Sequence, residues 1–260
     1  MNLLKRIVIS MIFIPLLIFL FYKSGWYLMF ALGIITVLQN IELRTMVKQK
    51  SIDIPIIIVP LSLFILIAFS HLSFEYIILS LLSIIFFVLG KDLFLNKIEG
   101  SFKRVSTAYF SVFYTSVLLS TLARITRFEF GNLFIISLLA LIWITDSAAY
   151  FVGMSMGKHR GIFPVSPKKS LEGFIGGFVF SMIASYFLYY FKFIPLREAL
   201  FAGISTGIFG QIGDLFESMI KRDFGVKDSS NIIPGHGGIL DRFDSLLIAA
   251  PIYYILLSIF

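Results

Sequence analysis

The 260-residue sequence contains no cysteine and few charged residues. Without cysteine, the chain has no disulfide, no thiolate nucleophile and no thiolate-bound zinc. Charged residues make up 14% of the sequence, against about 25% in soluble globular domains. Hydrophobic residues make up 58%, and the mean hydropathy is +0.94. A soluble globular domain is therefore excluded, and the composition indicates an integral membrane protein.

Apolar segments long enough to cross a bilayer recur along the whole chain. A membrane helix needs roughly 17 to 25 mainly apolar residues. Short stretches of alternating polarity, which are typical of membrane barrels, do not occur. The sequence therefore predicts an all-α polytopic integral membrane protein with about nine transmembrane helices. We expect these spans near residues 7–22, 25–41, 52–70, 74–90, 105–123, 131–152, 171–191, 197–219 and 244–260.

The first apolar run follows Lys5 and Arg6 and so resembles a secretory signal peptide. No small-residue cleavage site follows it and a second span begins at once, which indicates a retained membrane helix. We divide the chain into an N-terminal region of four helices and a basic linker (1–104), a central transmembrane region (105–170) and a C-terminal catalytic region (171–260). The stretch at 92–105 is either an interfacial amphipathic segment or a basic loop.

Basic residues are distributed unequally between the two sides that nine spans define. The N-terminus and the even-numbered loops hold 17 of the 22 Lys and Arg residues, and the other side holds 5. Because cytoplasmic loops are enriched in Lys and Arg, the N-terminus is expected in the cytoplasm and the C-terminus on the opposite side. The net charge of +7 is then explained by topology signals and by attraction to anionic lipid.

The eighth span carries small and ionisable residues at helical spacing. Intervals of 4, 3, 4, 3 and 4 residues predict one shared face for Gly203, Gly207, Gly210, Asp214, Glu217 and Lys221. Glycines on such a face normally allow a close approach by another helix. A carboxylate within the membrane needs a cation, however, and the nearby Asp241 and Asp244 favour a metal over a lysine.

Asp146 lies within the sixth span, on the face that also carries Trp143, Tyr150, Gly153 and Gly157. It is either a further metal ligand or the partner in a hydrogen bond between helices. An all-oxygen set of ligands suits magnesium bridging phosphates better than zinc. The sequence therefore predicts a metal site formed by Asp214, Asp241 and Asp244, with Asp146 as a fourth candidate.

The segment VSPKKSLEG forms a candidate anion site between the sixth and seventh spans. Pro167 interrupts any preceding helix, and Ser170 is suited to cap the helix that follows. A helix N-terminus attracts anions, and two lysines lie beside this one. We expect this substrate-binding segment to include Ser166, Lys168, Lys169, Ser170 and Glu172. The alternative is that the lysines serve only as topology signals.

The sequence excludes a P-loop and argues against a catalytic triad. The stretch GMSMGKH has glycines too closely spaced for a phosphate-binding P-loop, and His159 stands where Ser or Thr would bind magnesium. His236 lacks the Gly-x-Ser-x-Gly elbow that accompanies a Ser-His-Asp triad in one large class of hydrolases.

Residues 218–244, SMIKRDFGVKDSSNIIPGHGGILDRFD, resemble the signature of the phosphatidate cytidylyltransferases, also called CDP-diacylglycerol synthases. The fixed positions Lys-Arg, Lys-Asp, Pro-x-His-Gly-Gly and Asp-Arg-x-Asp are all filled. The stretches ITDSAAYFVGMSMGKHR and SPKKSLEG are similar to the central region of that family, so the resemblance covers about residues 140–244. Ser170 stands where Thr is frequent in the family, and a hydroxyl is retained.

The resemblance implies that CTP and phosphatidic acid react to give CDP-diacylglycerol and pyrophosphate. Magnesium is the expected cofactor, with the presence of a second cation left open. We assign phosphate contacts to Lys221, Arg222, Lys227 and Arg242, and the orientation of these groups or of the cytidine to Asp228 and His236.

The expected partners are CTP, phosphatidic acid and membrane lipid, and no nucleic acid. The glycine-rich faces and the resemblance also favour a homodimer. The expected location is the cytoplasmic (inner) membrane, with the active site facing the cytoplasm.

Two alternative functions stay open. A CTP-dependent kinase of a polyprenol or phytol would release CDP in place of pyrophosphate. A secondary transporter would use Asp146 and Asp214 as ion sites near the middle of the membrane. The complete signature argues against the kinase, and the polar residues gathered in the loops argue against the transporter.

Overall fold

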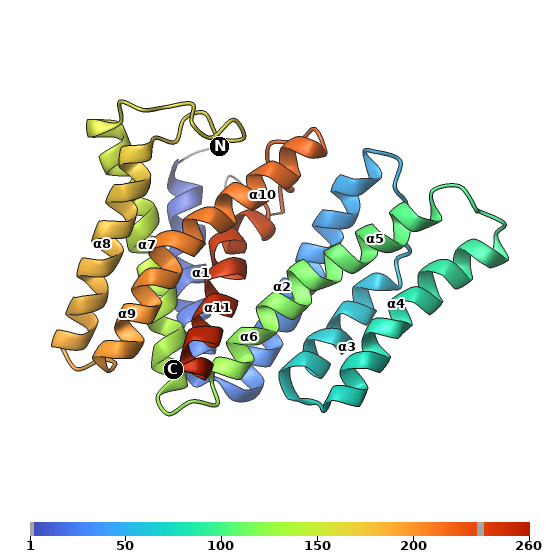
Figure 1. Cartoon of the computed structure of the whole chain (residues 1–260), viewed down its shortest axis with the longest axis horizontal. Helices are drawn as coiled ribbons and strands as arrows, with labels where there is room; N and C mark the ends of the chain where they lie inside the picture. The colour runs from blue at the N-terminus through green and yellow to red at the C-terminus, as the bar shows by residue number, and fades with distance from the viewer. Residues whose placement is uncertain (1–2, 233–236) are drawn as a thin grey trace.

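The computed structural model describes residues 3–232 and 237–260, with residues 3–10 described as helix without their side chains (Figure 1). All the named elements are helical, as the apolar runs predict. They are α1 (Leu3–Lys23), α2 (Gly25–Lys48), α3 (Ile58–His71), α4 (Phe74–Phe94), α5 (Ser101–Val112), η1 (Phe113–Val117), α6 (Leu118–Ile125), α7 (Gly131–Met156), α8 (Leu171–Tyr190), α9 (Leu196–Ile204), η2 (Ser205–Gly210), α10 (Gln211–Asp223) and α11 (Leu240–Ile259).

Seven helical segments in the described part of the chain are long and apolar enough to cross a membrane. Two of them are continuous through a π-helical turn, η1 or η2. The expected first and third spans correspond to shorter apolar stretches, Met11–Lys23 and Ile58–His71. The seven segments are Gly25–Lys48, Phe74–Phe94, Ser101–Ile125, Gly131–Met156, Leu171–Tyr190, Leu196–Asp223 and Leu240–Ile259.

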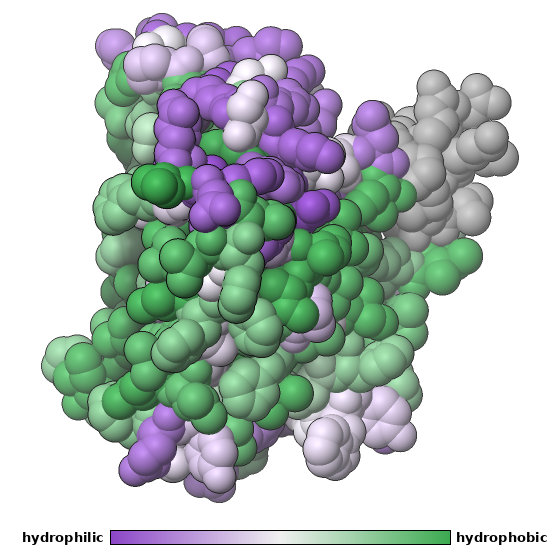
Figure 2. All heavy atoms as spheres, turned by 90° about the vertical axis from the view of Figure 1, so that its right-hand side faces the viewer, coloured by the Kyte–Doolittle hydropathy of each residue, from purple (hydrophilic) through white to green (hydrophobic). Residues whose placement is uncertain are grey.

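One face of the molecule has an apolar band between two more hydrophilic ends (Figure 2). Figure 2 shows the band around the middle of one face, with hydrophilic side chains gathered mainly at the upper end. The α7–α8 linker and the C-terminal end of α10 lie at that upper end, and the C-terminus lies at the lower one (Figure 1). This arrangement is expected for a protein that crosses a bilayer, because apolar side chains face the lipid.

Two clusters of buried apolar side chains hold the helices together. The larger one centres on α7 and α11 and includes Phe21 of α1 and the fully buried ring of Tyr253. The smaller one joins α2, α3, α4 and α5 through residues such as Ile65 and Val88. Between α4 and α5, the stretch at 92–105 forms no separate amphipathic helix: a short link joins the two helices, and Arg104 ion-pairs with Asp92 at 2.9 Å.

Helix α8 packs through a face of small residues. Its buried positions are Gly173, Gly177, Ser181 and Ser185, which recur every four residues and allow close approach between helices. A Cβ atom on Gly177 would lie 2.9 Å from Gln211 Oε1, across the contact with the eighth predicted span. Gly177 therefore allows the close packing of α8 against Gln211 of α10 (Gln211–Asp223).

The single face predicted for the eighth span is divided by the π-helical turn η2, and the prediction is wrong in this respect. Gly203 and Gly207 face α8, where their Cβ atoms would meet Ser185 and Ser181. Gly210, beyond the turn, instead faces α11. A π turn accommodates one additional residue, which rotates the following helix relative to a regular 3.6-residue spacing. The turn thereby directs α10 towards α11.

Candidate active site

A polar cavity of about 730 Å³ opens between the ends of α7, α8, α10 and α11. Its lining contains five basic and five acidic side chains, so it can bind anionic groups and cations together. Ten of the predicted site residues lie there: Asp146, Lys168, Lys169, Ser170, Asp214, Lys221, Asp228, Asp241, Arg242 and Asp244. The structure thus brings together residues separated by almost one hundred positions in the sequence.

Ser170 caps helix α8, as the sequence predicts. The helix begins at Leu171, and the Ser170 hydroxyl accepts a hydrogen bond from the Gly173 N–H at 3.1 Å. The side chain is buried, and a Cβ atom on Gly157 would lie only 2.7 Å from its oxygen. Gly157, which directly follows α7, therefore leaves the space in which this cap forms, at the wall of the cavity.

Lys169 connects the α7–α8 linker to helix α10. Its ammonium nitrogen lies 2.6 Å from Asp214 Oδ2, and about one third of each side chain is exposed. Ser166 contributes to the linker through its backbone, because its carbonyl oxygen accepts a hydrogen bond from the Lys169 N–H at 3.0 Å. This ion pair brings the predicted anion site and the predicted metal site into direct contact.

Lys221 lies between two carboxylates at the junction of α10 and α11. Its ammonium group forms ion pairs with Glu217, four residues earlier, and with Asp241 Oδ1 at 2.5 Å. Glu217 is fully buried and Lys221 is almost so. Because isolated charges are costly in such surroundings, each of the three groups depends on the others.

Asp241 also organises the loop that precedes it. Its Oδ2 atom accepts hydrogen bonds from the backbone N–H groups of Ser229 (3.0 Å) and Gly238 (2.8 Å). The Ser229 hydroxyl lies 2.8 Å from the same oxygen. Asp241 is thus occupied by a lysine and by loop donors, which differs from the role of free metal ligand expected for it.

Asp146 and Asp244 have no Lys or Arg partner within ion-pairing distance in the described part of the chain, although both line the cavity. Asp244 accepts a hydrogen bond from the Ser245 N–H of its own helix at 2.6 Å. Residues 3–232 and 237–260 contain no group of three or more acidic or His side chains close enough to hold a metal alone. Mg²⁺, however, is commonly held by one or two carboxylates together with substrate phosphates and water. The oxygen donors present fit that kind of site.

Five predicted residues do not line the cavity or fall outside the described chain. Glu172 accepts hydrogen bonds from the backbone N–H of His159 at 3.2 Å and lies 2.5 Å from its ring. Arg222 donates to the Val226 carbonyl oxygen at 2.8 Å, and Lys227 is exposed beside it. Ser166 lies in the linker, as described above. His236 lies outside the described residues.

Two cavity residues were missed by the sequence analysis. Arg160 donates to the carbonyl oxygens of Gly153 (2.8 Å) and Gly157 (3.2 Å), which fixes its guanidinium at the cavity wall. Gln211 also lines the cavity and donates to the Phe174 carbonyl oxygen at 3.0 Å. Arg160 could have been included in the predicted site because it lies near the SPKKS segment in the sequence, whereas no sequence pattern indicated Gln211.

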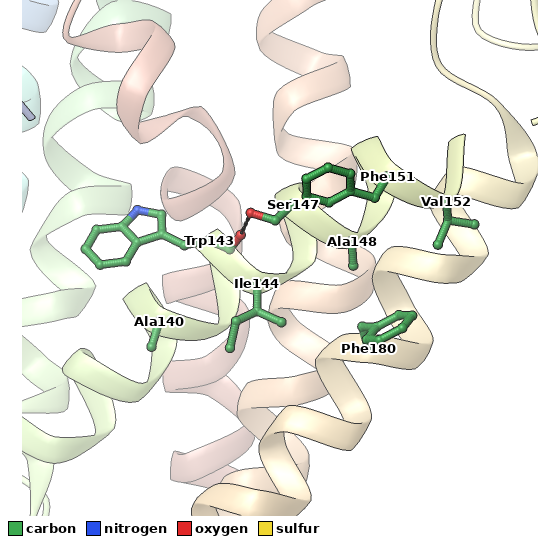
Figure 3. Close-up of a pocket in the computed structure, with 8 residues that line it drawn as sticks. All are labelled: Ala140, Trp143, Ile144, Ser147, Ala148, Phe151, Val152 and Phe180. Atoms are coloured by element: carbon green, nitrogen blue, oxygen red, sulfur yellow. Dashed lines mark hydrogen bonds between the residues drawn. The ribbon is translucent and has the colours of Figure 1, made fainter. Parts of the chain in front are cut away.

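An apolar groove of about 550 Å³ lies on the outer face of α7 and α8, next to the polar cavity. Figure 3 shows Ala140, Ile144 and Ala148 of α7 pointing to the side on which Phe180 of α8 lies, and Phe151 also lines the groove. Trp143 lines both the groove and the cavity. A polar and an apolar compartment therefore meet at one side chain.

Comparison with known proteins identifies close relatives over nearly the whole chain. The sequence matches the cytidylyltransferase family over residues 4–260. It is 37% identical to the phosphatidate cytidylyltransferase of Staphylococcus aureus and 38% identical to that of Staphylococcus saprophyticus, in both cases over 98% of this chain and 97% of the relative. Identity rises to 47% with the phosphatidate cytidylyltransferase of Bacillus subtilis, over 51% of this chain and 50% of the relative.

Proposed function

The chain belongs to the cytidylyltransferase family, and from this premise we propose that it acts through the polar cavity described above. It is a nucleotidyltransferase that transfers the cytidylyl group of CTP to phosphatidic acid, giving CDP-diacylglycerol and pyrophosphate. The observation that carries the assignment is that signature residues from three separate segments line one cavity beside an apolar groove.

The reaction joins two anions. A phosphate oxygen of phosphatidic acid attacks the α-phosphorus of CTP, and the bond from that phosphorus to the oxygen bridging the β-phosphate breaks. Pyrophosphate leaves with the electron pair of that bond. An ionised phosphate is already a nucleophile and needs no general base, so repulsion between the substrates is the main obstacle. Fixed positive charge along the cavity wall reduces this repulsion and stabilises charge on the leaving group.

We assign the phosphate contacts to basic residues that line the cavity. Lys168 and Arg160 lie in the linker beside the N-terminus of α8, where free N–H groups also favour anions. Arg242 lies in the first turn of α11 and is exposed. Lys169 and Lys221 already hold carboxylates, so their main effect is to position Asp214 and Asp241.

Mg²⁺ is the proposed cofactor, and one or two of the cavity carboxylates Asp146, Asp214 and Asp244 would hold it together with substrate phosphates and water. When bound, the ion supplies positive charge to phosphate oxygens and so stabilises the transition state. The three carboxylates share one cavity, and repulsion among them favours a bound cation.

The cavity and the groove suggest how the lipid substrate is placed. The head group enters the polar cavity, while an acyl chain lies in the apolar groove on the far side of Trp143. Two acyl chains can then remain at membrane depth throughout the reaction. This requires an opening towards the lipid, which the position of the groove on the outer face of α7 and α8 supports.

The proposed placement in the membrane has nine spans, with the N-terminus and the cavity on the cytoplasmic side of the cytoplasmic membrane. The 17 to 5 division of basic residues supports this orientation. CTP and Mg²⁺ are also found on that side. A homodimer remains part of the proposal, on the basis of the glycine-rich helix faces.

Transfer of label tests the proposal directly. Purified protein in detergent is given phosphatidic acid, Mg²⁺ and CTP labelled with ³²P at the α-phosphate, and lipid-bound label and pyrophosphate are both measured. We expect equal amounts of the two, and loss of both in Asp214→Asn, in Asp241→Asn and in a chelator. Release of CDP in place of pyrophosphate would indicate a lipid kinase. Transfer unaffected by either variant would overturn the assigned site.

A further inference from the structure

A buried carboxylate in α2, Glu42, forms hydrogen bonds to residues 229–230 and 239–240, at the two ends of the loop that precedes α11. Glu42 itself lies outside the region, about residues 140–244, that resembles the family. Glu42 is 1% exposed and lies near the end of α2, almost two hundred residues before the residues it contacts. Its side chain does not line the polar cavity. It nevertheless contacts the loop that carries Asp228 and the start of α11, which carries Asp241 and Arg242, and these three residues line the cavity.

Glu42 accepts hydrogen bonds from both ends of this loop. At the first end, the Ser230 hydroxyl donates to Oε1 at 2.6 Å, and the Ser229 hydroxyl lies 3.1 Å from Oε2. At the second end, the backbone N–H groups of Ile239 and Leu240 donate to Oε1 and Oε2, each at 2.8 Å. One carboxylate therefore ties residues 229–230 to residues 239–240.

The charge of Glu42 is compensated by these donors. No Lys or Arg forms an ion pair with it in the described part of the chain. Ile239 and Leu240 form the start of α11, where helix N–H groups lack partners within the helix and favour a negative charge. Glu42 thus caps a helix to which it is not connected in sequence, and charge-assisted hydrogen bonds of this kind are strong.

Glu42 is linked to the cavity residue Asp241 through Ser229 and Gly238, each of which lies next to both carboxylates. The Ser229 hydroxyl lies between Glu42 Oε2 and Asp241 Oδ2 and has one proton to donate between them. Gly238 passes so close that a Cβ atom there would lie 2.5 Å from Glu42 Oε1. Moving Glu42 would consequently move both the start of α11 and the backbone that holds Asp241.

We propose that Glu42 is a positioning residue for the cytidylyl transfer, because it fixes both ends of the loop between Ser229 and Leu240 and so sets the place of Asp241 and Arg242 in the cavity. This inference rests on the proposed function. A displacement of about 1 Å far from the reacting atoms can reduce a rate about 100-fold. The loss should fall mainly on kcat, since Glu42 itself does not line the cavity.

The test compares Glu42→Gln with Asp92→Asn, a matched control. Asp92 is also a buried carboxylate, but it pairs with Arg104 at the α4–α5 link and has no hydrogen bond to the described residues of the loop. For each folded variant, kcat and KM for CTP are measured, together with amide hydrogen exchange at Ile239 and Leu240. We expect Glu42→Gln to lower kcat about 100-fold, with a smaller change in KM and faster exchange at both amides. Asp92→Asn should lower only the unfolding midpoint.

A double-variant comparison separates positioning from general destabilisation. If Glu42 acts through Ser230, then Ser230→Ala should reduce kcat in the native background and have little further effect in Glu42→Gln. A Glu42→Gln variant with native kcat and native exchange, but a lower unfolding midpoint, would show a purely structural role and overturn the inference. If the native protein transferred no label, the proposed function would fail with this inference, and the exchange data would still show whether Glu42 holds the loop.

Discussion

The ammonium nitrogen of Lys221 lies 2.5 Å from Asp241 Oδ1, across the junction of α10 and α11. Only 10% of the Lys221 side chain and 7% of the Asp241 side chain is exposed. On its other side Lys221 pairs with the fully buried Glu217. This lysine is therefore the group that allows two carboxylates to be buried beside the cavity.

Replacement of Lys221 by Met should destabilise the protein and abolish activity. Removing one partner of a buried ion pair costs about 3–5 kcal/mol, because a buried charge is left without compensation. We expect a fall of roughly 10 °C in the unfolding midpoint, measured in detergent by thermal denaturation.

Lys50→Met provides the control for this change. Lys50 also pairs with an aspartate, Asp223 at 2.7 Å, but both side chains are largely exposed. An exposed pair contributes about 0–1 kcal/mol. Equal shifts in the two variants would contradict the role given to Lys221.

Gly213→Ala should separate α10 from α11 and reduce kcat. A Cβ atom at Gly213 would lie 2.7 Å from the backbone oxygen of Asp244, which cannot move without shifting α11. Overpacking of this kind costs about 1–3 kcal/mol. Gly90→Ala is the control, because a Cβ atom there would meet nothing within 4 Å and Ala favours a helix. A Gly213→Ala enzyme with native kcat would show that the close crossing of these helices is not required.

The sequence was sufficient to predict the helical class and most of the candidate site. Long apolar runs cross a bilayer as helices, because a helix satisfies its backbone hydrogen bonds within one segment. The cap at Ser170 can be predicted from residue types alone. The face of the eighth span was not predictable, because nothing in its glycine spacing indicates the π-helical turn at Ser205–Gly210. Long-range partners were not predictable either: Glu42 lies in an apolar helix, and only tertiary packing brings it to Ile239.

The pairing of the acidic residues also depended on packing. Asp214, Asp241 and Asp244 were expected to act as equal metal ligands, and all three line the cavity. The structure distinguishes them, since Asp214 and Asp241 pair with lysines, whereas among the described residues Asp244 accepts a hydrogen bond only from its own helix. Side chains from three segments, the α7–α8 linker, α10 and α11, decide this difference, and no local sequence pattern indicates it.

Removal of divalent metal should abolish transfer, and Asp244→Asn should weaken the binding of Mg²⁺. Asp244 has no lysine or arginine partner in the described part of the chain, so its charge is available to a cation. We expect the Mg²⁺ concentration that gives half-maximal rate to rise at least about tenfold, because changes to groups around a metal site typically reduce metal affinity by about 10- to 100-fold. Asp53→Asn, which alters an exposed carboxylate paired with Arg44, should leave this concentration unchanged. An Asp244→Asn enzyme with a native Mg²⁺ dependence would remove Asp244 from the proposed site.

Ala148→Phe should change the response to lipid without changing the response to CTP. Ala148 lines the apolar groove beside Phe151 and Phe180, and a phenyl ring there would fill part of the space assigned to an acyl chain (Figure 3). We expect KM to rise for phosphatidic acid with long chains and to stay near the native value for short-chain phosphatidic acid and for CTP. Val179→Phe is the control, because Val179 is exposed on α8 and does not line the groove. If Ala148→Phe raised KM for both chain lengths equally, the groove would have no part in holding the acyl chain, and the chain would have to lie elsewhere along the cavity opening.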